Sequence, residues 1–230
     1  MADIATGLVY YVVFLFSTTL HEAAHAWAAK RGGDETAYLG GQVSLDPMPH
    51  IRREPFGMVI LPLITVLISG WPFGYASAPS DPRWAYRYPR RAALMALAGP
   101  AANLLIVIAA ALLLRLGVMA GVFYVPDIAR FGDLAWYNAA GLWPAIATTL
   151  SIFFSLNLLL AVFNLLPLPP LDGSGAIPLV LSEKTSRAYQ MFLWSNPALG
   201  WIGILIAWQV FAILFAPLFW GAVDLPYIGI

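Results

Sequence analysis

Four long apolar segments constrain the fold of this chain more than any other feature. A membrane-crossing helix needs about 20 predominantly apolar residues, and the segments that meet this length are residues 5–29, 92–114, 141–166 and 198–220. Of the 230 residues, 60% are hydrophobic and only 10% are charged, which is too apolar for a soluble domain. The sequence therefore predicts an all-α polytopic membrane protein, a single membrane-embedded domain over residues 1–230 with about four to six transmembrane helices.

A fifth apolar segment, residues 56–70, is too short to be assigned as an ordinary span. It contains Pro62 and runs directly into Trp-Pro-Phe-Gly at residues 71–74, so we expect either a re-entrant element or a short crossing. Between it and the first span, residues 37–46 contain Gly40 and Gly41 and end before a proline. This composition predicts a short β-strand or hairpin after the first helix.

The basic residues predict the orientation. If residues 56–70 return to the side from which they entered, ten of the twelve Lys and Arg residues face one side of the membrane, and only Arg115 and Arg130 face the other. The positive-inside rule assigns the richer side to the cytoplasm. We therefore expect a multi-pass protein of the cell membrane with its N-terminus outside. The formal net charge is zero and there is no long basic run, so the sequence does not favour nucleic-acid binding.

The first apolar segment contains His21-Glu22-Ala23-Ala24-His25, the spacing of a zinc-hydrolase helix. Residues four apart lie on one face of an α-helix, so both imidazoles can reach one metal ion while Glu22 projects beside them. Ionisable groups within a span are costly and by default mark a functional site; the alternative is a polar helix face packed against other spans. His25 lies about 7 Å along the helix from Lys30, which predicts a site near the cytoplasmic boundary.

Two histidines leave a catalytic zinc site one protein ligand short, because such sites hold three protein ligands and a water. The chain has no cysteine, so the third ligand of the one expected Zn²⁺ must be a histidine or a carboxylate. His50 is one candidate. Asp172 is favoured because it follows an apolar span at the predicted cytoplasmic end, at the depth of His25. An aspartate in this position also serves as a helix N-cap or a turn residue, and that alternative stays open.

Three motifs occur in the order and approximate spacing of the site-2 proteases, a family of intramembrane zinc metalloproteases, and the chain resembles this family over most of its length. The motifs are His21 to His25, Ala98-Gly99-Pro100-Ala101-Ala102-Asn103 in the middle span, and Asn164 followed by Leu171-Asp172-Gly173. The resemblance implies that His21, His25 and Asp172 bind zinc. It also implies that Glu22 is the general base and acid, and that Asn164 helps to hold the scissile carbonyl or its oxyanion.

Residues 44–50, Ser-Leu-Asp-Pro-Met-Pro-His, resemble a stretch of the compact branch of the family, which lacks a PDZ domain. Two features depart from the family pattern. The family's Asn-Pro-Asp-Gly is Pro170-Leu171-Asp172-Gly173 here, which leaves the ligand intact, and a lysine expected near residues 76–79 is absent, which bears on substrate contacts. His50 is either a residue on the substrate side of the site or a surface histidine of a loop. Asn103 either supports the site or packs between helices.

These features predict an intramembrane zinc metalloprotease, which hydrolyses peptide bonds in or near the transmembrane segments of membrane proteins with a metal-activated water. Its expected partners are a transmembrane protein substrate, the lipid bilayer and a regulatory membrane protein. We also expect the segment from Tyr38 to Leu45 to pair, as a β-strand, with an unwound substrate. The alternatives are a catalytically inactive membrane scaffold and a transporter that uses the same intramembrane polar groups.

Overall fold

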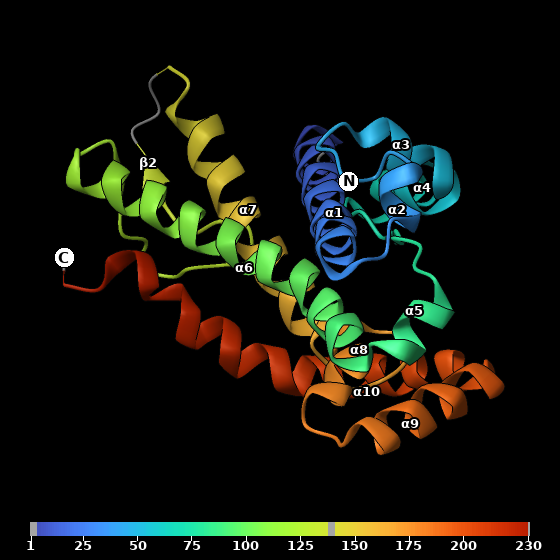
Figure 1. The fold of residues 1–230 in the computed structure, drawn as a ribbon. Helices are drawn as coiled ribbons and strands as arrows, with labels where there is room; N and C mark the ends of the chain where they lie inside the picture. The colour runs from blue at the N-terminus through green and yellow to red at the C-terminus, as the bar shows by residue number, and fades with distance from the viewer. Residues whose placement is uncertain (1–3, 138–140, 230) are drawn as a thin grey trace.

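The computed structural model describes residues 4–137 and 141–229. Within these residues, four helices are long and apolar enough to cross a membrane. They are α1 (Ile4–Gly32), α6 (Pro89–Met119), α7 (Trp143–Asn164) and α10 (Ala198–Val223) (Figure 1). Each contains or closely overlaps one of the four apolar segments, so the predicted polytopic helical fold is confirmed. The chain is a multi-pass membrane protein.

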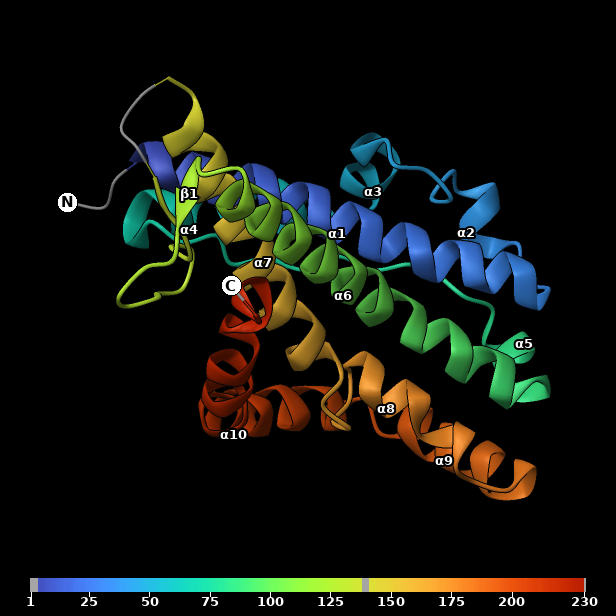
Figure 2. The ribbon, with the colours of Figure 1, turned by 90° about the vertical axis from the view of Figure 1, so that its left-hand side faces the viewer.

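Shorter elements connect these helices. They are α2 (Thr36–Leu39), α3 (Pro47–Arg53), the π-helical turn η1 (Phe56–Ile60), α4 (Leu61–Ser69), α5 (Pro82–Arg87), α8 (Asp172–Ala176), the 3₁₀ turns η2 (Ile177–Leu179) and η3 (Leu225–Tyr227), and α9 (Glu183–Ser195). Figure 2 shows α2, α5 and α9 at one end of the long helices, and α4 and β1 at the opposite end. The basic residues of α1, α5 and α9 therefore gather at one end, as the charge pattern predicts.

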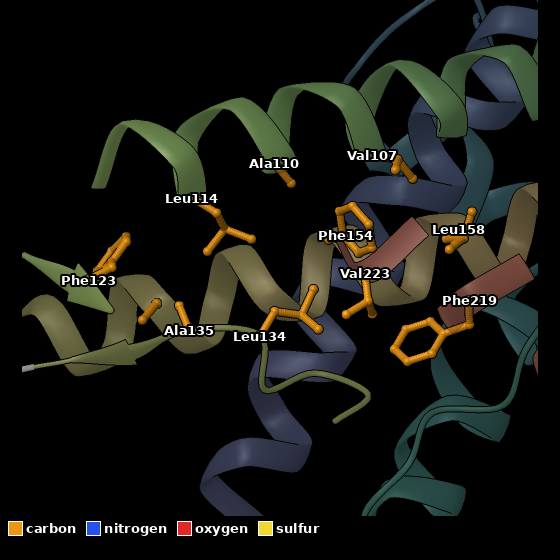
Figure 3. Packing of buried hydrophobic residues seen from close by; sticks show 11 residues of the cluster. Val107, Ala110, Leu114, Phe123, Leu134, Ala135, Phe154, Leu158, Phe219 and Val223 are labelled. Carbon is orange, nitrogen blue, oxygen red and sulfur yellow. The ribbon is translucent and has the colours of Figure 1, made fainter. Parts of the chain in front are cut away.

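The largest hydrophobic cluster lies between α6, α7 and the end of α10 (Figure 3). Leu114 and Phe154 are fully buried in it, and Phe219 contributes from α10. The connection between α6 and α7 folds onto the same cluster and contributes Phe123, Leu134 and Ala135 to it. Within this connection, the two-residue strands β1 (Phe123–Tyr124) and β2 (Trp136–Tyr137) pair antiparallel. This packing fixes α6 against α7 and leaves the other ends of both helices to form the site.

Residues 34–81 form an excursion beside α1 that leaves and rejoins the same end of that helix. The segment leaves the C-terminal end of α1, and α4 runs back along it until Gly70 packs against Gly7 near the start of that helix. The chain then returns to the C-terminal end of α1, where the backbone N–H of Asp81 donates to the side chain of Asp34 over 2.8 Å. Residues 34–81 as a whole therefore begin and end at the same end of α1, whereas residues 56–70 run toward its opposite end. The re-entrant alternative for residues 56–70 stays a prediction.

The return path is a nearly straight strap, residues 71–81, which has no helix or strand. From Gly7 to Gly32, α1 rises about 37 Å at about 1.5 Å per residue. The 11 residues that follow Gly70 reach at most about 36–40 Å when fully extended. Because it must cover almost the same length, the strap is close to full extension.

The prediction of a strand or hairpin at residues 37–46 is wrong. Residues from Thr36 form α2, and the helix ends in a Schellman motif, with the N–H of Gln42 donating to Ala37 O and that of Gly41 to Tyr38 O. Gly41 has φ = 76°, the left-handed conformation that this motif requires. The glycine that indicated a hairpin turn therefore stops a helix, and the two-stranded sheet lies between α6 and α7 instead.

Candidate metal centre

His21 and His25 lie one turn apart on α1 and direct their imidazoles to the same point. Both residues are buried, with 7% and 5% of their surfaces exposed, and their Nε2 atoms are 3.0 Å apart. Glu22, between them in sequence, is also buried. The spacing of the motif thus produces the predicted arrangement of two imidazoles on one helix face with a carboxylate beside them.

Asp172 reaches the same point from the start of α8, far along the chain. One carboxylate oxygen, Oδ2, lies 3.1 Å from Nε2 of His21 and 3.3 Å from Nε2 of His25. The turn that delivers it requires Gly173, since a Cβ there would overlap the carbonyl oxygens of Leu165 and Leu166 at the end of α7. The structure therefore brings together the three residues that the sequence predicted as metal ligands.

The three ligating atoms fit a tetrahedral zinc ion. Ligands about 2.0–2.1 Å from zinc in a tetrahedron lie about 3.3 Å from one another, and the three separations here are 3.0, 3.1 and 3.3 Å. Oδ2 of Asp172 is buried and accepts no hydrogen bond within the described residues. Gly99 on α6 faces the Nε2 atoms of both histidines, where a Cβ would overlap them. The donor set and the room beside it suit one divalent cation.

Both imidazoles are oriented by hydrogen bonds to α6. Nδ1 of His25 lies 2.7 Å from the backbone oxygen of Met95, and Nδ1 of His21 lies 2.6 Å from Oδ1 of Asn103. Both partners are acceptors, so each Nδ1 carries the proton and each Nε2 keeps its lone pair. This is the tautomer that a histidine needs to ligate a metal through Nε2.

The carboxyl of Asp172 is held in its ionised form. Burial alone would raise its pKa, but the imidazoles of His21 and His25, when protonated, outweigh burial and hold the pKa of Asp172 below its usual range. A metal ligand must be a carboxylate rather than a carboxylic acid, so the electrostatics of the site agree with its geometry.

A pocket of about 300 Å³ opens beside the three ligands. Its walls are the strap on one side and α6 on the other, and the residues that line it are Glu22, His25, Ala76, Ser77, Ala78, Ser80, Ala92, Met95, Ala96, Pro170 and Asp172. Ser77 anchors the strap from behind: its hydroxyl donates to Glu54 over 2.5 Å, and its carbonyl accepts from Gln42 over 3.1 Å. Glu22 therefore lines the same cavity as two of the three ligands, His25 and Asp172.

The remaining predicted residues lie outside this pocket. The side chain of Asn164 donates to Leu160 O in its own helix over 3.0 Å, so its role in oxyanion binding stays a prediction. His50 is buried on α3, with Nε2 3.1 Å from Ser44 O, and is not a surface residue. Asn103 contacts a ligand directly. The sequence interpretation missed Met95, and it treated Gly99 only as a small residue for helix packing.

Comparison with known proteins identifies the family. The model of peptidase family M50 matches residues 9–194. YwhC of Bacillus subtilis (strain 168), described as a candidate zinc metalloprotease, is 34% identical over 163 residues, which are 70% of this chain and 64% of YwhC. Rip2 of Mycolicibacterium smegmatis, described in the same way, is 32% identical over 194 residues, which are 81% of this chain and 65% of Rip2. No solved structure matches the chain.

The chain spans less than two thirds of the length of these two relatives. Rip2 of Mycobacterium tuberculosis (strain H37Rv) is 29% identical over 206 residues, which are 85% of this chain and 70% of that protein. The region matched by the family model contains all four residues of the site, His21, Glu22, His25 and Asp172. The chain belongs to peptidase family M50, the site-2 protease family.

Proposed function

We propose that this protein is an intramembrane zinc metalloprotease that hydrolyses peptide bonds in or near the transmembrane segments of other membrane proteins. The observation that carries the proposal is the convergence of His21, His25 and Asp172 on one point beside Glu22. Residues far apart in the sequence meet there at the distances of metal ligands. Neither a scaffold nor a transporter requires a carboxylate base next to such a donor set.

The chemistry follows from the residues around the pocket. Zinc, when bound, acidifies its water and polarises a scissile carbonyl. Glu22 removes the proton of the attacking water and later delivers it to the leaving amine, so one carboxylate serves as base and then as acid. The imidazoles of His21 and His25 and the carboxylate of Asp172 hold the ion. Asn164 has the proposed role of donating to the developing oxyanion.

The strap is the proposed docking edge for the substrate, in place of the segment from Tyr38 to Leu45. Among the described residues, the backbone N–H groups of Ala76, Ser77 and Ala78 donate to no acceptor. Backbone groups at membrane depth need partners, and an unwound substrate segment would supply them by pairing along the strap. Such pairing would offset part of the cost of unwinding a transmembrane helix next to the ligands.

The proposed orientation places the site on the cytoplasmic side of the cell membrane. The positive-inside rule supports this, because the end of the molecule that carries α5 and α9 is rich in Lys and Arg. The proposed partners are a transmembrane substrate and the surrounding lipid. A regulatory membrane protein that controls access to the pocket is part of the same proposal.

The first prediction tests the proposed activity with Glu22→Gln. The variant keeps the shape of the side chain but removes the base, so cleavage of co-expressed single-span membrane proteins should fall by about 10²–10⁴-fold. About one zinc per chain should remain bound, because the three ligands are untouched. Cleavage is scored on immunoblots and zinc is measured on the purified protein.

Glu183→Gln is the matched control, since Glu183 is an exposed residue on α9. It should cleave and bind zinc as the wild type does. Wild-type protein without stoichiometric zinc, or undiminished cleavage by Glu22→Gln, would refute the proposed function. A transporter would keep its flux, and a scaffold its partners, after the change at Glu22.

A further inference from the structure

A chain of buried polar side chains runs from His21 across three membrane helices. Oδ1 of Asn103 on α6 contacts Nδ1 of His21 over 2.6 Å, and Nδ2 of Asn103 donates to Oδ1 of Asn157 on α7 over 2.8 Å. Nδ2 of Asn157 donates in turn to Ser17 Oγ on α1 over 2.9 Å and to Phe153 O over 2.8 Å. Ser17, Asn103 and Asn157 have no exposed surface.

The hydrogen bonds of Asn157 impose a direction on this chain. Ser17 and Phe153 take both donors of its amide, so the amide oxygen faces Asn103. That oxygen needs a donor, which fixes Nδ2 of Asn103 toward α7 and Oδ1 of Asn103 toward His21. If the amide of Asn103 turned over, a donor would face Nδ1 of His21, and the imidazole proton would move to Nε2.

A proton on Nε2 would exclude His21 from the metal site, because that nitrogen points at His25 and Asp172. Bonds between polar side chains also hold membrane helices together without any other role. Two features distinguish this series of hydrogen bonds from ordinary helix packing. It ends on the metal ligand His21, and its donors and acceptors have one consistent direction from Phe153 to His21.

We propose that Asn157 is a positioning residue that sets the amide orientation of Asn103 and, through it, the tautomer in which His21 ligates the metal. The inference rests on the proposed zinc site and extends it to a residue on α7 that touches neither the metal ligands nor the pocket. Asn157 thereby makes the affinity of the site depend on the packing of α7 against α1 and α6.

The second prediction uses Asn157→Leu, and zinc affinity is measured by chelator competition on the purified protein. The leucine leaves the amide of Asn103 free to turn, so the Kd for zinc should rise at least about 10-fold, the usual effect of losing a group that orients a metal ligand. Asn103→Asp combined with Asn157→Leu should restore affinity to within about threefold of wild type, because a carboxylate offers His21 an acceptor in either orientation.

Ser155→Ala is the control for damage to α7. Ser155 is equally buried and holds the backbone of Gly132, but it does not touch the polar chain, so zinc affinity should be unchanged. If Asn157→Leu does not fold, Asn157→Ser replaces it, since serine is too short to reach Asn103 and the same loss is expected.

Three outcomes are distinguishable. A wild-type protein that binds no zinc would refute the proposed function itself. A wild type that binds zinc, with unchanged affinity in the Asn157 variants, would refute only the inference. Loss of affinity that Asn103→Asp does not restore would also refute it, because Asn157 would then act through packing alone.

Discussion

At the scale of single residues, the site depends as much on a missing side chain as on the ligands. Gly99 places the backbone of α6 directly against the Nε2 atoms of His21 and His25. Met95 and Asn103, one turn away on either side, hold the Nδ1 atoms of the same rings. The close approach that glycine permits and the hydrogen bonds that orient the imidazoles are therefore two parts of one contact between α1 and α6.

The third prediction is that Gly99→Ala strongly weakens metal binding. The new methyl group would overlap Nε2 of both histidines, so the imidazoles must move away from Asp172. Zinc affinity should fall by more than about 100-fold, beyond the usual effect of changing an orienting group. Zinc content and chelator competition measure the loss.

Gly221→Ala on α10 is the matched control, because a Cβ at Gly221 meets no atom within 4 Å. It makes the same chemical change in another membrane helix and should leave zinc affinity at the wild-type value. Zinc bound to Gly99→Ala with wild-type affinity would contradict the close approach of α6.

At the scale of elements, the helices could be predicted from the sequence and the connections between them could not. Apolar segments of about 20 residues predict spans because lipid offers the backbone no partners. Residues 37–46 were assigned wrongly because Gly40 and Gly41 suit a hairpin and a helix terminus equally well. Only the bonds of Gln42 and Gly41 to the carbonyls of α2 separate the two.

The site was predictable to the same degree and for similar reasons. The motif from His21 to His25 is local, and the helical period alone brings its side chains together. Asp172 was favoured by its depth, but its distance to the histidines depends on Gly173 and on how α7 ends. The contacts of Met95 and Asn157 depend on helix packing, which periodicity does not specify, so sequence reasoning missed both.

The fourth prediction concerns the strap as a docking edge. Ala78→Pro removes a free backbone donor from the wall of the pocket, so cleavage should fall by about 10-fold or more, the factor that 1.4 kcal/mol of lost hydrogen bonding produces. Zinc binding should persist. Val43→Pro, in the segment that the sequence suggested as a template, should cleave within about threefold of wild type. The opposite result for the two variants would return the docking role to residues 38–45.

At the scale of the whole molecule, the fold joins distant parts of the chain at one end of the membrane helices. α1 supplies two ligands and the base, α6 orients the imidazoles, and the turn after α7 supplies Asp172. The opposite end is closed by the packing of α6, α7 and α10 around the cluster in Figure 3. The pocket beside the ligands therefore opens near the end that carries α5 and α9, where the basic residues gather.

The fifth prediction tests the orientation of the whole molecule. The chain has no cysteine, so single cysteines can be introduced into the wild type at exposed positions. Glu35→Cys and Lys184→Cys should resist a membrane-impermeant maleimide in intact cells and react after permeabilisation. Asp127→Cys, in the connection between α6 and α7, should react in intact cells. The reversed pattern would place the pocket on the outer side.

The strap also has a mechanical consequence. A chain segment near its contour length cannot stretch, so the distance between the tip of α4 and the start of α5 has a fixed upper limit. In a bilayer thicker than the molecule, the lipid around it must therefore thin, because the strap cannot lengthen to match it. The wall of the pocket that the strap forms therefore cannot lengthen along α1.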